Sequence, residues 1–357
     1  MGWARRFPAA GRLQATTLAL RLGRSLGRRG GSGCCGRSGR QAWRPPPTVA
    51  DVAARRRADL PAGGRARYDA LLAGPAVEPG LSAVLERALA SGTPVDALDS
   101  LAGIWPELAA RDREQLAAPL RLGRGARQLR FAGSPARQSD QTTCGSTVLA
   151  MLAAAGDPLF ALWLVTGRRL AGHLPPEVRA LAPADRSEPD AGARFAAVQR
   201  VIKSRSNRAA LGPLPWPSIL GTPPWGAARV ARYPGAAYSA VMADDTDASG
   251  FGALLDRVER SLAAGVPVPL FTGGDLGSGL TTAIPRHVVL LVPDQSRPDR
   301  ERPDREEAGA AAGSYRVFDP ASGAVHGVTR AELLGPAGAR AALGGWSHVC
   351  WAVLPRA

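Results

Sequence analysis

The residue best suited to nucleophilic chemistry is Cys144, one of four cysteines in the chain. It follows a polar segment, 138–143, and precedes a helical pattern whose buried face carries Val148, Leu149 and Leu152. Cys144 is therefore expected at a helix N-terminus, where unpaired N–H groups and the positive end of the helix dipole stabilise a thiolate. A lone cysteine is more often a small buried apolar residue. The polar approach and the position at the start of a helix favour a reactive thiol instead.

A nucleophilic thiol needs a base, and the chain has only four histidines. His287 opens an apolar run, 287–292, whose β-branched residues predict a strand. The next predicted strand, 314–318, is followed by Asp319. An antiparallel hairpin of these two strands would bring Asp319 close to His287, where a carboxylate can fix the tautomer of the imidazole. The other histidines are expected to be structural: His173, His326 and His348.

These features resemble the papain-like cysteine peptidases, in particular the bacteriocin-processing (double-glycine leader) endopeptidase group. The similar features are Gln138 six residues before Cys144-Gly, a histidine opening an apolar strand, and Asp-Pro at the end of the next strand. The pattern also includes a glycine two residues before a proline, then a hydrophobic run ahead of the histidine strand, which segment 265–271 matches. Segment 221–226 is similar to the connecting region of the same group. The resemblance covers about residues 131–357. It implies an α+β, papain-like fold in which a central helix packs on an antiparallel sheet.

The resemblance also implies a role for each matching residue. Cys144 would be the nucleophile, His287 the general base and then acid, and Asp319 the orienting carboxylate. The side-chain amide of Gln138 and the backbone N–H of Cys144 would form the oxyanion hole, with Gln141 as a competing position. The separation of 143 residues from Cys144 to His287 is long for the compact leader peptidases, so we expect insertions within 157–250.

The function expected from this triad is thiol-dependent hydrolysis of a peptide or related amide bond, with a peptide or protein as substrate. No cofactor and no metal site are expected, because no Cys and His spacing matches a zinc site. Two alternatives stay open. One is a deamidase or acyltransferase that uses the same triad, and the other is an inactive papain-like module that binds a peptide.

The net charge of the chain is unevenly distributed. The whole sequence of 357 residues carries +15, from 45 Lys and Arg against 30 Asp and Glu. Residues 1–57 contain 13 Arg and a single acidic residue, Asp51, so the remainder is nearly neutral. A basic surface is typical of nucleic-acid binding, but most of the basicity here lies in the leader. We expect 1–57 to be an Arg-rich disordered leader, with weak contact to nucleic acid or an anionic surface as the alternative.

A small helical region, 58–130, is expected between the leader and the peptidase-like domain at 131–357. Leu81, Val84, Leu85 and Ala88 recur at the spacing of one buried helix face. Ser-Gly-Thr-Pro at 91–94 predicts the end of that helix. A second helical stretch is predicted over 95–120, with Pro106 as a kink or restart.

Composition excludes several classes of protein. No apolar run reaches the ~18–20 residues of a membrane-spanning helix, and four cysteines in 357 residues exclude a disulfide-stapled scaffold. The apolar stretch 13–22 is too short and too often interrupted by Arg for a secretory signal. We therefore expect a cytoplasmic protein, with export through an atypical N-terminus as the alternative.

The charged segment 294–313 is predicted to be a solvent-exposed hairpin insertion.

Overall fold

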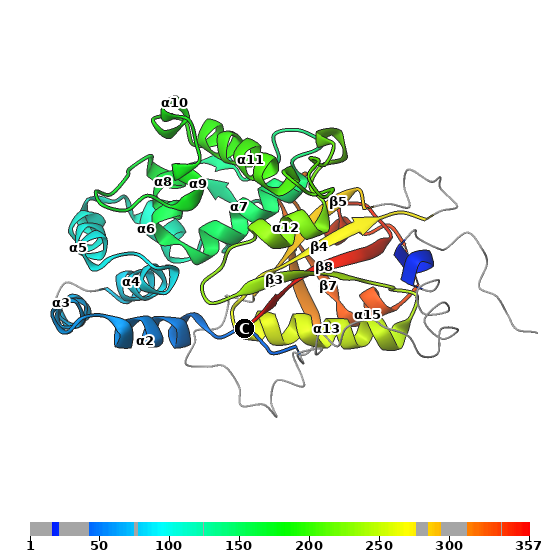
Figure 1. Ribbon diagram of the computed structural model, residues 1–357, viewed down its shortest axis with the longest axis horizontal. Coiled ribbons are helices and arrows are strands. Elements are labelled where there is room, and N and C mark those ends of the chain that lie inside the picture. Colours follow the sequence, from blue (N-terminus) through cyan, green and yellow to red (C-terminus); the bar gives the residue numbers. More distant parts are fainter. Residues whose placement is uncertain are drawn as a thin grey trace, which may run out of the picture.

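A computed structural model of the protein describes residues 16–20, 43–74, 78–123, 125–275, 285–293, 313–336 and 338–357. The chain is an α+β structure in which helices surround an antiparallel sheet (Figure 1). Most of the expected leader and nearly all of the predicted 294–313 insertion lie outside the described residues.

The helices divide into an N-terminal group and a group around the sheet (Figure 1). They are α2 (Val49–Asp59), α3 (Ala62–Ala73), α4 (Pro79–Ser91), α5 (Val95–Ile104), α6 (Ala110–Ala117), α7 (Cys144–Gly156), α8 (Pro158–Thr166), α9 (Pro176–Arg179), α10 (Pro183–Arg186), α11 (Ala191–Asn207), α12 (Pro224–Val230), α13 (Ala248–Ala263) and α15 (Arg330–Leu334), with 3-10 turns η2 (Trp105–Glu107), η3 (Ser218–Leu220) and η6 (Ala341–Leu343).

The N-terminal helices follow local sequence signals. Helix α4 ends at Ser91 and is followed by Gly92, whose φ of 95° is a left-handed conformation that favours glycine. The stretch predicted over 95–120 is broken into α5, η2 and α6, with Pro106 inside η2. Helix α2 begins at Val49 with a capping box formed by Thr48 and Asp51. It therefore crosses the boundary that the sequence analysis placed between residues 57 and 58.

Helix α7 runs through the centre of the protein, and all of its residues are buried. Helix α8 follows directly, because Asp157 caps its N-terminus by accepting the N–H groups of Leu159 and Phe160. Among the described residues, no single helix is long and apolar enough to cross a membrane; α7 and α8 meet that test only as a pair bent by 114°.

The sheet has six strands in the order β3-β8-β4-β5-β6-β7, and every neighbouring pair is antiparallel. The strands are β3 (Ala237–Met242), β4 (Val268–Gly273), β5 (His287–Val292), β6 (Ser314–Phe318), β7 (Val325–Thr329) and β8 (His348–Arg356). A separate two-stranded pair, β1 (Arg130–Phe131) and β2 (Ser134–Pro135), precedes α7. The antiparallel pairing of β5 with β6 is the one that the sequence predicts.

The sheet separates two hydrophobic cores, as the alternation of side chains along β5 shows. Val288 and Leu290 pack in the core that contains α7 and α8, whereas Val289 and Leu291 pack in the core that contains α13. Helices α7 and α12 cover one face of the sheet, and α13 and α15 cover the other (Figure 1). The end of the sheet where β5 begins and β6 ends therefore lies close to the start of α7.

Candidate active site

Cys144 is the first residue of α7 and is only 5% exposed. The preceding residue, Thr143, does not cap the helix with its side chain. Its hydroxyl instead donates to the carbonyl of Asp140 (2.9 Å) and accepts the N–H of Asp140 (3.0 Å). The N–H groups in the first turn of α7 thus have no side-chain cap, and they remain beside the thiol as donors for a negative charge.

His287 opens β5, and Asp319 directly follows β6 in the neighbouring strand. The Nε2 atom of His287 lies 2.7 Å from Oδ1 of Asp319, and the two residues are 7% and 5% exposed. Both carboxylate oxygens of Asp319 have further donors in the turn that follows β6. Oδ1 accepts the N–H of Ala321 (3.1 Å), and Oδ2 accepts the hydroxyl (2.6 Å) and the N–H (3.1 Å) of Ser322.

The electrostatics of this pair favour charges on both residues. Burial by itself lowers the pKa of His287, but hydrogen bonds with Asp319 and Cys144 outweigh it and raise that pKa to about 9. Burial likewise opposes ionisation of Asp319, but hydrogen bonds from His287 and Ser322 lower its pKa to about 2. At neutral pH an imidazolium therefore faces a carboxylate on one side and the sulfur of Cys144 on the other.

The geometry also selects which ring nitrogen serves which partner. Because Nε2 of His287 is bonded to Asp319, Nδ1 is the nitrogen left for Cys144. The structure thus brings together the three residues that the sequence analysis singled out as a triad, Cys144, His287 and Asp319. A thiol, an imidazole and a carboxylate in this order can transfer a proton between the thiol and a leaving group.

The backbone of Gln138 is hydrogen-bonded to the turn that follows Asp319. Its N–H donates to the carbonyl of Pro320 (2.8 Å), directly after Asp319. Buried Gln199 fixes the adjoining residues by accepting the N–H of Ser139 (2.8 Å) and donating to the carbonyl of Arg137 (2.9 Å). The side-chain oxygen of Gln138 is buried and has no hydrogen-bond partner among the described residues.

The alternative glutamine has a different setting. Gln141 is exposed and lies in the turn before α7. Gln138, whose side-chain oxygen is buried, is therefore the better placed of the two for a role inside the site.

Two further residues of the site, Ser322 and Gln199, were not predicted from the sequence. Ser322 lies three residues after Asp319 in an Asp-Pro-Ala-Ser-Gly turn, and such a turn commonly bonds its own aspartate. That local signal could have identified Ser322. Gln199 lies in the middle of α11, 60 residues from Ser139, and no local pattern in the sequence marks it.

The remaining histidines lie outside this site. His348 is fully buried, with Nδ1 2.9 Å from Asp245 and Nε2 2.7 Å from Asp275. His326 lies within β7, and His173 lies in the loop between α8 and α9. Among the described residues, no group of three or more His, Cys, Asp or Glu side chains is arranged to hold a metal ion.

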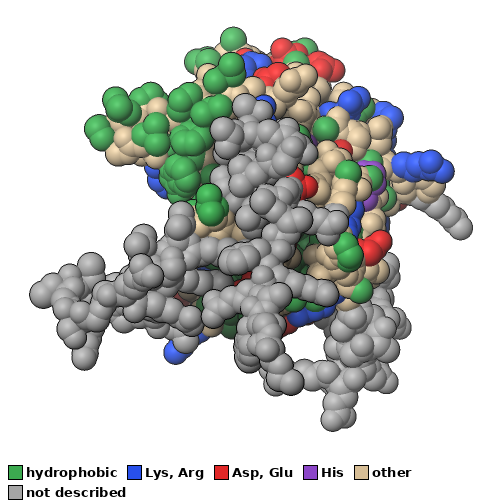
Figure 2. All heavy atoms as spheres, turned by 90° about the vertical axis from the view of Figure 1, so that its right-hand side faces the viewer, with side chains coloured by type: hydrophobic (Ala, Val, Ile, Leu, Met, Phe, Trp, Pro, Cys, Tyr) green, Lys and Arg blue, Asp and Glu red, His purple; other side chains and the backbone are tan. Residues whose placement is uncertain are grey.

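An exposed apolar segment, residues 211–225, adjoins the start of α7. Its large exposed side chains are Leu211, Leu214, Ile219, Leu220 and Trp225. The segment is packed against the Cys144 turn, because a Cβ on Gly145 would lie only 2.7 Å from Cβ of Thr222. Figure 2 shows hydrophobic side chains gathered at the upper left of the face that it presents.

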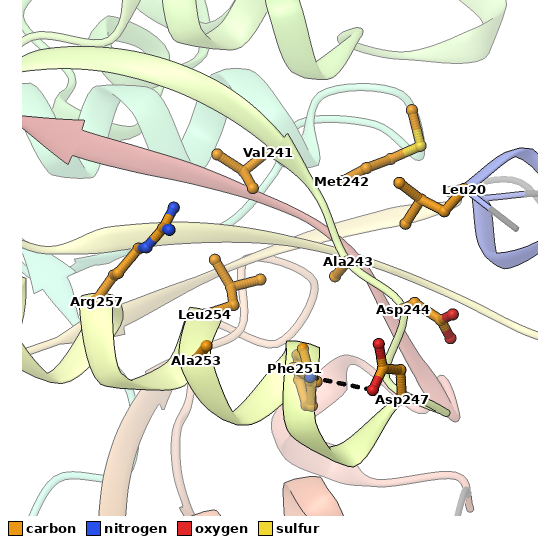
Figure 3. Close-up of a pocket in the computed structure, with 11 residues that line it drawn as sticks. Leu20, Val241, Met242, Ala243, Asp244, Asp247, Phe251, Ala253, Leu254 and Arg257 are labelled. Carbon is orange, nitrogen blue, oxygen red and sulfur yellow. Dashed lines mark hydrogen bonds between the residues drawn. The ribbon is translucent and has the colours of Figure 1, made fainter. Parts of the chain in front are cut away.

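A separate cavity of about 130 Å³ lies between the end of β3 and α13 (Figure 3). Its lining is mainly apolar, with Val241, Phe251 and Leu254 from these two elements. The carboxylate of Asp247, which also lines it, caps α13 by accepting the N–H of Gly250 (3.1 Å). This cavity contains no thiol or imidazole, so it is not the centre of the triad.

Comparison with known proteins adds no assignment. No family model matches the chain, and neither a curated protein nor a solved structure is significantly similar to it.

Proposed function

We propose that this chain is a thiol-dependent hydrolase of peptide bonds, with a papain-like arrangement of a Cys144–His287–Asp319 triad. The single observation that carries the proposal is the position of His287, which is hydrogen-bonded to Asp319 at 2.7 Å and is close enough to Cys144 for that residue to raise its pKa. The order of the supporting elements, a central helix bearing the thiol followed by two antiparallel strands bearing the base and the carboxylate, agrees with that arrangement.

The chemical steps follow from the site. The thiolate of Cys144 attacks the carbonyl carbon of the scissile bond, and the carbonyl oxygen becomes an oxyanion. Donors for this oxyanion are the uncapped N–H groups of α7 and the side-chain amide of Gln138, and each well-placed donor is worth roughly 10²–10³ in rate. His287 then gives its proton to the leaving amine as the carbon–nitrogen bond breaks, which leaves a thioester on Cys144.

The second half of the reaction regenerates the enzyme. His287, now neutral, takes a proton from a water molecule, and the resulting hydroxide attacks the thioester carbonyl. The carbon–sulfur bond breaks, the carboxylic acid product leaves, and the Cys144 thiolate and the His287 imidazolium are restored. Asp319 keeps Nε2 of His287 in place throughout and stabilises the imidazolium.

The substrate proposed for this site is a peptide with apolar residues near the bond that is cleaved. The exposed 211–225 segment adjoins Cys144 through Thr222 and Gly145. Apolar side chains of a substrate would remove those of Leu214, Ile219 and Leu220 from water, which is favourable at about 25 cal/mol per Å².

The test combines labelling of the thiol with turnover. A small electrophile such as iodoacetamide is suitable because Cys144 is only 5% exposed. We expect Cys144 to be alkylated far faster than Cys350, which is fully buried in β8. Incubation with a mixture of unstructured peptides should give new termini detectable by mass spectrometry. Cys144→Ala should abolish both signals, and Cys350→Ala is the matched control that should retain them.

Three other outcomes contradict the proposal in different ways. A mass gain at Gln or Asn without backbone cleavage would identify a deamidase. Incorporation of an added amine would identify an acyltransferase. A Cys144 that is alkylated no faster than Cys350 would indicate an inactive module, and tight peptide binding without cleavage would identify its role.

A further inference from the structure

Gly344 lies against the edge of the His287 imidazole. A Cβ atom placed on Gly344 would be 2.1 Å from Cδ2 and 2.6 Å from Nε2 of His287. Both distances are far shorter than any van der Waals contact. Nε2 is also the atom that is hydrogen-bonded to Asp319. The absence of a side chain at position 344 thus leaves the space that the imidazole occupies when it is bonded to Asp319.

The backbone around Gly344 requires a left-handed conformation. Gly344 ends the η6 turn with φ 67° and ψ 29°, and its N–H donates to the carbonyl of Ala341 (3.0 Å). Gly345 follows with φ 84° and donates to the carbonyl of Arg340 (2.9 Å). A Cβ on Gly345, in contrast, would meet nothing within 4 Å. The two glycines share the same backbone requirement and differ in whether a side chain would strike His287.

The turn that carries Gly344 is fixed to the sheet beside His287. The buried hydroxyl of Thr272 donates to the carbonyl of Leu343 (3.0 Å). Thr272 is the residue of β4 that pairs with His287 of β5. Ala342 and Leu343 are themselves buried in the core on the α13 side of the sheet. Because the turn is anchored in this way, it has no room to retreat, and a side chain at position 344 would displace the imidazole instead.

We propose that Gly344 is a positioning residue that keeps the His287 imidazole bonded to Asp319 and directed at Cys144. This inference rests on the proposed hydrolase function, since a positioned imidazole matters there for proton transfer. Gly344 acts only through His287 and touches no reacting atom.

The experiment compares Gly344→Ala with Gly345→Ala in the full chain. Both variants place alanine in a left-handed conformation and therefore carry similar backbone strain. Only Gly344→Ala places a methyl group where the imidazole lies. The readout is the titration of His287, followed by NMR with isotope-labelled histidine and assigned with His287→Gln. We expect the His287 pKa to fall from about 9 toward its ordinary value in Gly344→Ala and to stay unchanged in Gly345→Ala.

Turnover gives a second readout. A misplaced catalytic group can lower the rate by ~10², so kcat/KM should fall about that much in Gly344→Ala and at most about two-fold in Gly345→Ala. Equal behaviour of the two variants, or an unchanged His287 titration in Gly344→Ala, would overturn the proposal.

The two proposals fail in different ways. If the wild type cleaves no peptide but His287 titrates differently only in Gly344→Ala, the positioning role stands and the hydrolase assignment fails. If the wild type cleaves peptides but the two variants behave alike, the hydrolase assignment stands and the positioning role fails. Should Gly344→Ala not fold, Thr272→Val releases the turn while keeping Gly344. A lower His287 pKa is expected there, and an unchanged one would again overturn the proposal.

Discussion

His287 and Asp319 are 32 residues apart in sequence, and their side chains meet at 2.7 Å between Nε2 and Oδ1. The contact joins the beginning of β5 to the end of β6, so the register of that strand pair determines it. Four hydrogen bonds converge on the carboxylate, because the N–H of Ala321 and both the N–H and the hydroxyl of Ser322 also donate to it. A buried charge pair requires such additional partners, since desolvation opposes both charges.

Removal of the Asp319 charge should weaken catalysis by releasing His287. In Asp319→Ala we expect kcat/KM to fall by roughly 10²–10⁴, as for other triads that lose the orienting carboxylate. The pKa of His287 should fall below about 9, because its largest raising partner is lost. Asp319→Asn keeps an acceptor for Nε2 without the charge, so its activity should lie between those of Asp319→Ala and the wild type. Steady-state kinetics and histidine NMR measure both quantities, and an unchanged titration of His287 in Asp319→Ala would contradict the assignment.

Activity should depend on pH through the proton that His287 gives to the leaving amine. With a His287 pKa of about 9, the imidazolium is present at neutral pH and is lost as the pH rises through about 9. The value of kcat/KM should therefore decline on the alkaline side near that pH, and initial rates across a pH series measure it. If kcat/KM instead declined near the ordinary pKa of histidine, His287 would not be hydrogen-bonded as it is in this structure.

The shifted pKa values of His287 and Asp319 also make folding stability depend on pH, each in a direction that follows from its shift. The pKa of His287 is raised from 6.5 to about 9 on folding, so its stabilisation is complete below pH 6.5 and is lost as the pH rises through about 9. The pKa of Asp319 is lowered from 3.8 to about 2, so its stabilisation is complete above pH 3.8 and is lost as the pH falls through about 2. Both contributions are therefore complete only between pH 3.8 and pH 6.5. The measurement is the free energy of unfolding in urea across a pH series, for the wild type and for His287→Gln. The difference between the two proteins gives the contribution of His287 at each pH.

The local parts of the site could be predicted from the sequence because they depend on near neighbours. A helix that starts at Cys144 follows from the polar approach and the apolar face after it, and α7 begins at that residue. A strand that opens with His287 follows from its β-branched run, and β5 has that start. The pairing of the next strand follows because a hairpin is the simplest connection between adjacent antiparallel strands.

The rest of the site depends on long-range packing that no local pattern encodes. The last strand, β8, lies between β3 and β4 in the sheet, and this order depends on which faces are buried together. The contact of Gly344 with His287 is of the same kind, since the turn is carried there by β8 and fixed by Thr272. The sequence shows Gly344-Gly345 only as a turn, and only three-dimensional packing distinguishes the two residues.

The apolar segment beside Cys144 should determine affinity for substrate more than the rate of chemistry. Leu214 and Ile219 are 63% and 80% exposed, so polar substitutions there should leave the fold intact. We expect Leu214→Ser combined with Ile219→Ser to raise KM by about tenfold or more, with kcat changed little, because each apolar contact is worth roughly 1–2 kcal/mol and about 1.4 kcal/mol is a factor of ten. Leu18→Ser is the matched control, since Leu18 is also exposed (44%) but lies outside this segment. Equal KM values for all three proteins would remove the segment from the binding surface.

Arg232 should be important for stability because it neutralises two buried carboxylates. Its guanidinium contacts Glu177 at 2.6 Å and Asp157 at 3.0 Å, and their side chains are 5% and 2% exposed. Arg232→Leu leaves both acids without this partner, and the free energy of unfolding should fall by about 3–5 kcal/mol. Arg168→Leu is the matched control, because Arg168 pairs with Glu107 at the surface, where such a pair is worth only ~0–1 kcal/mol. Urea unfolding measures both variants, and similar losses would contradict the role of Arg232.

His348 provides the last test, because it connects the segments that follow β3 and β4. Its imidazole lies between Asp245 and Asp275. Burial lowers the pKa of His348, but the hydrogen bonds that its imidazole donates to the two carboxylates outweigh that effect and raise the pKa. His348→Leu should therefore lower the free energy of unfolding by roughly 2–4 kcal/mol at neutral pH, since it leaves two carboxylates facing each other without a cation between them. Adding Asp275→Leu removes one of these charges and should restore part of the loss. If the two substitutions were simply additive in urea unfolding, the carboxylates would not be coupled through His348, because coupled charges give a non-zero interaction energy in a double-mutant cycle.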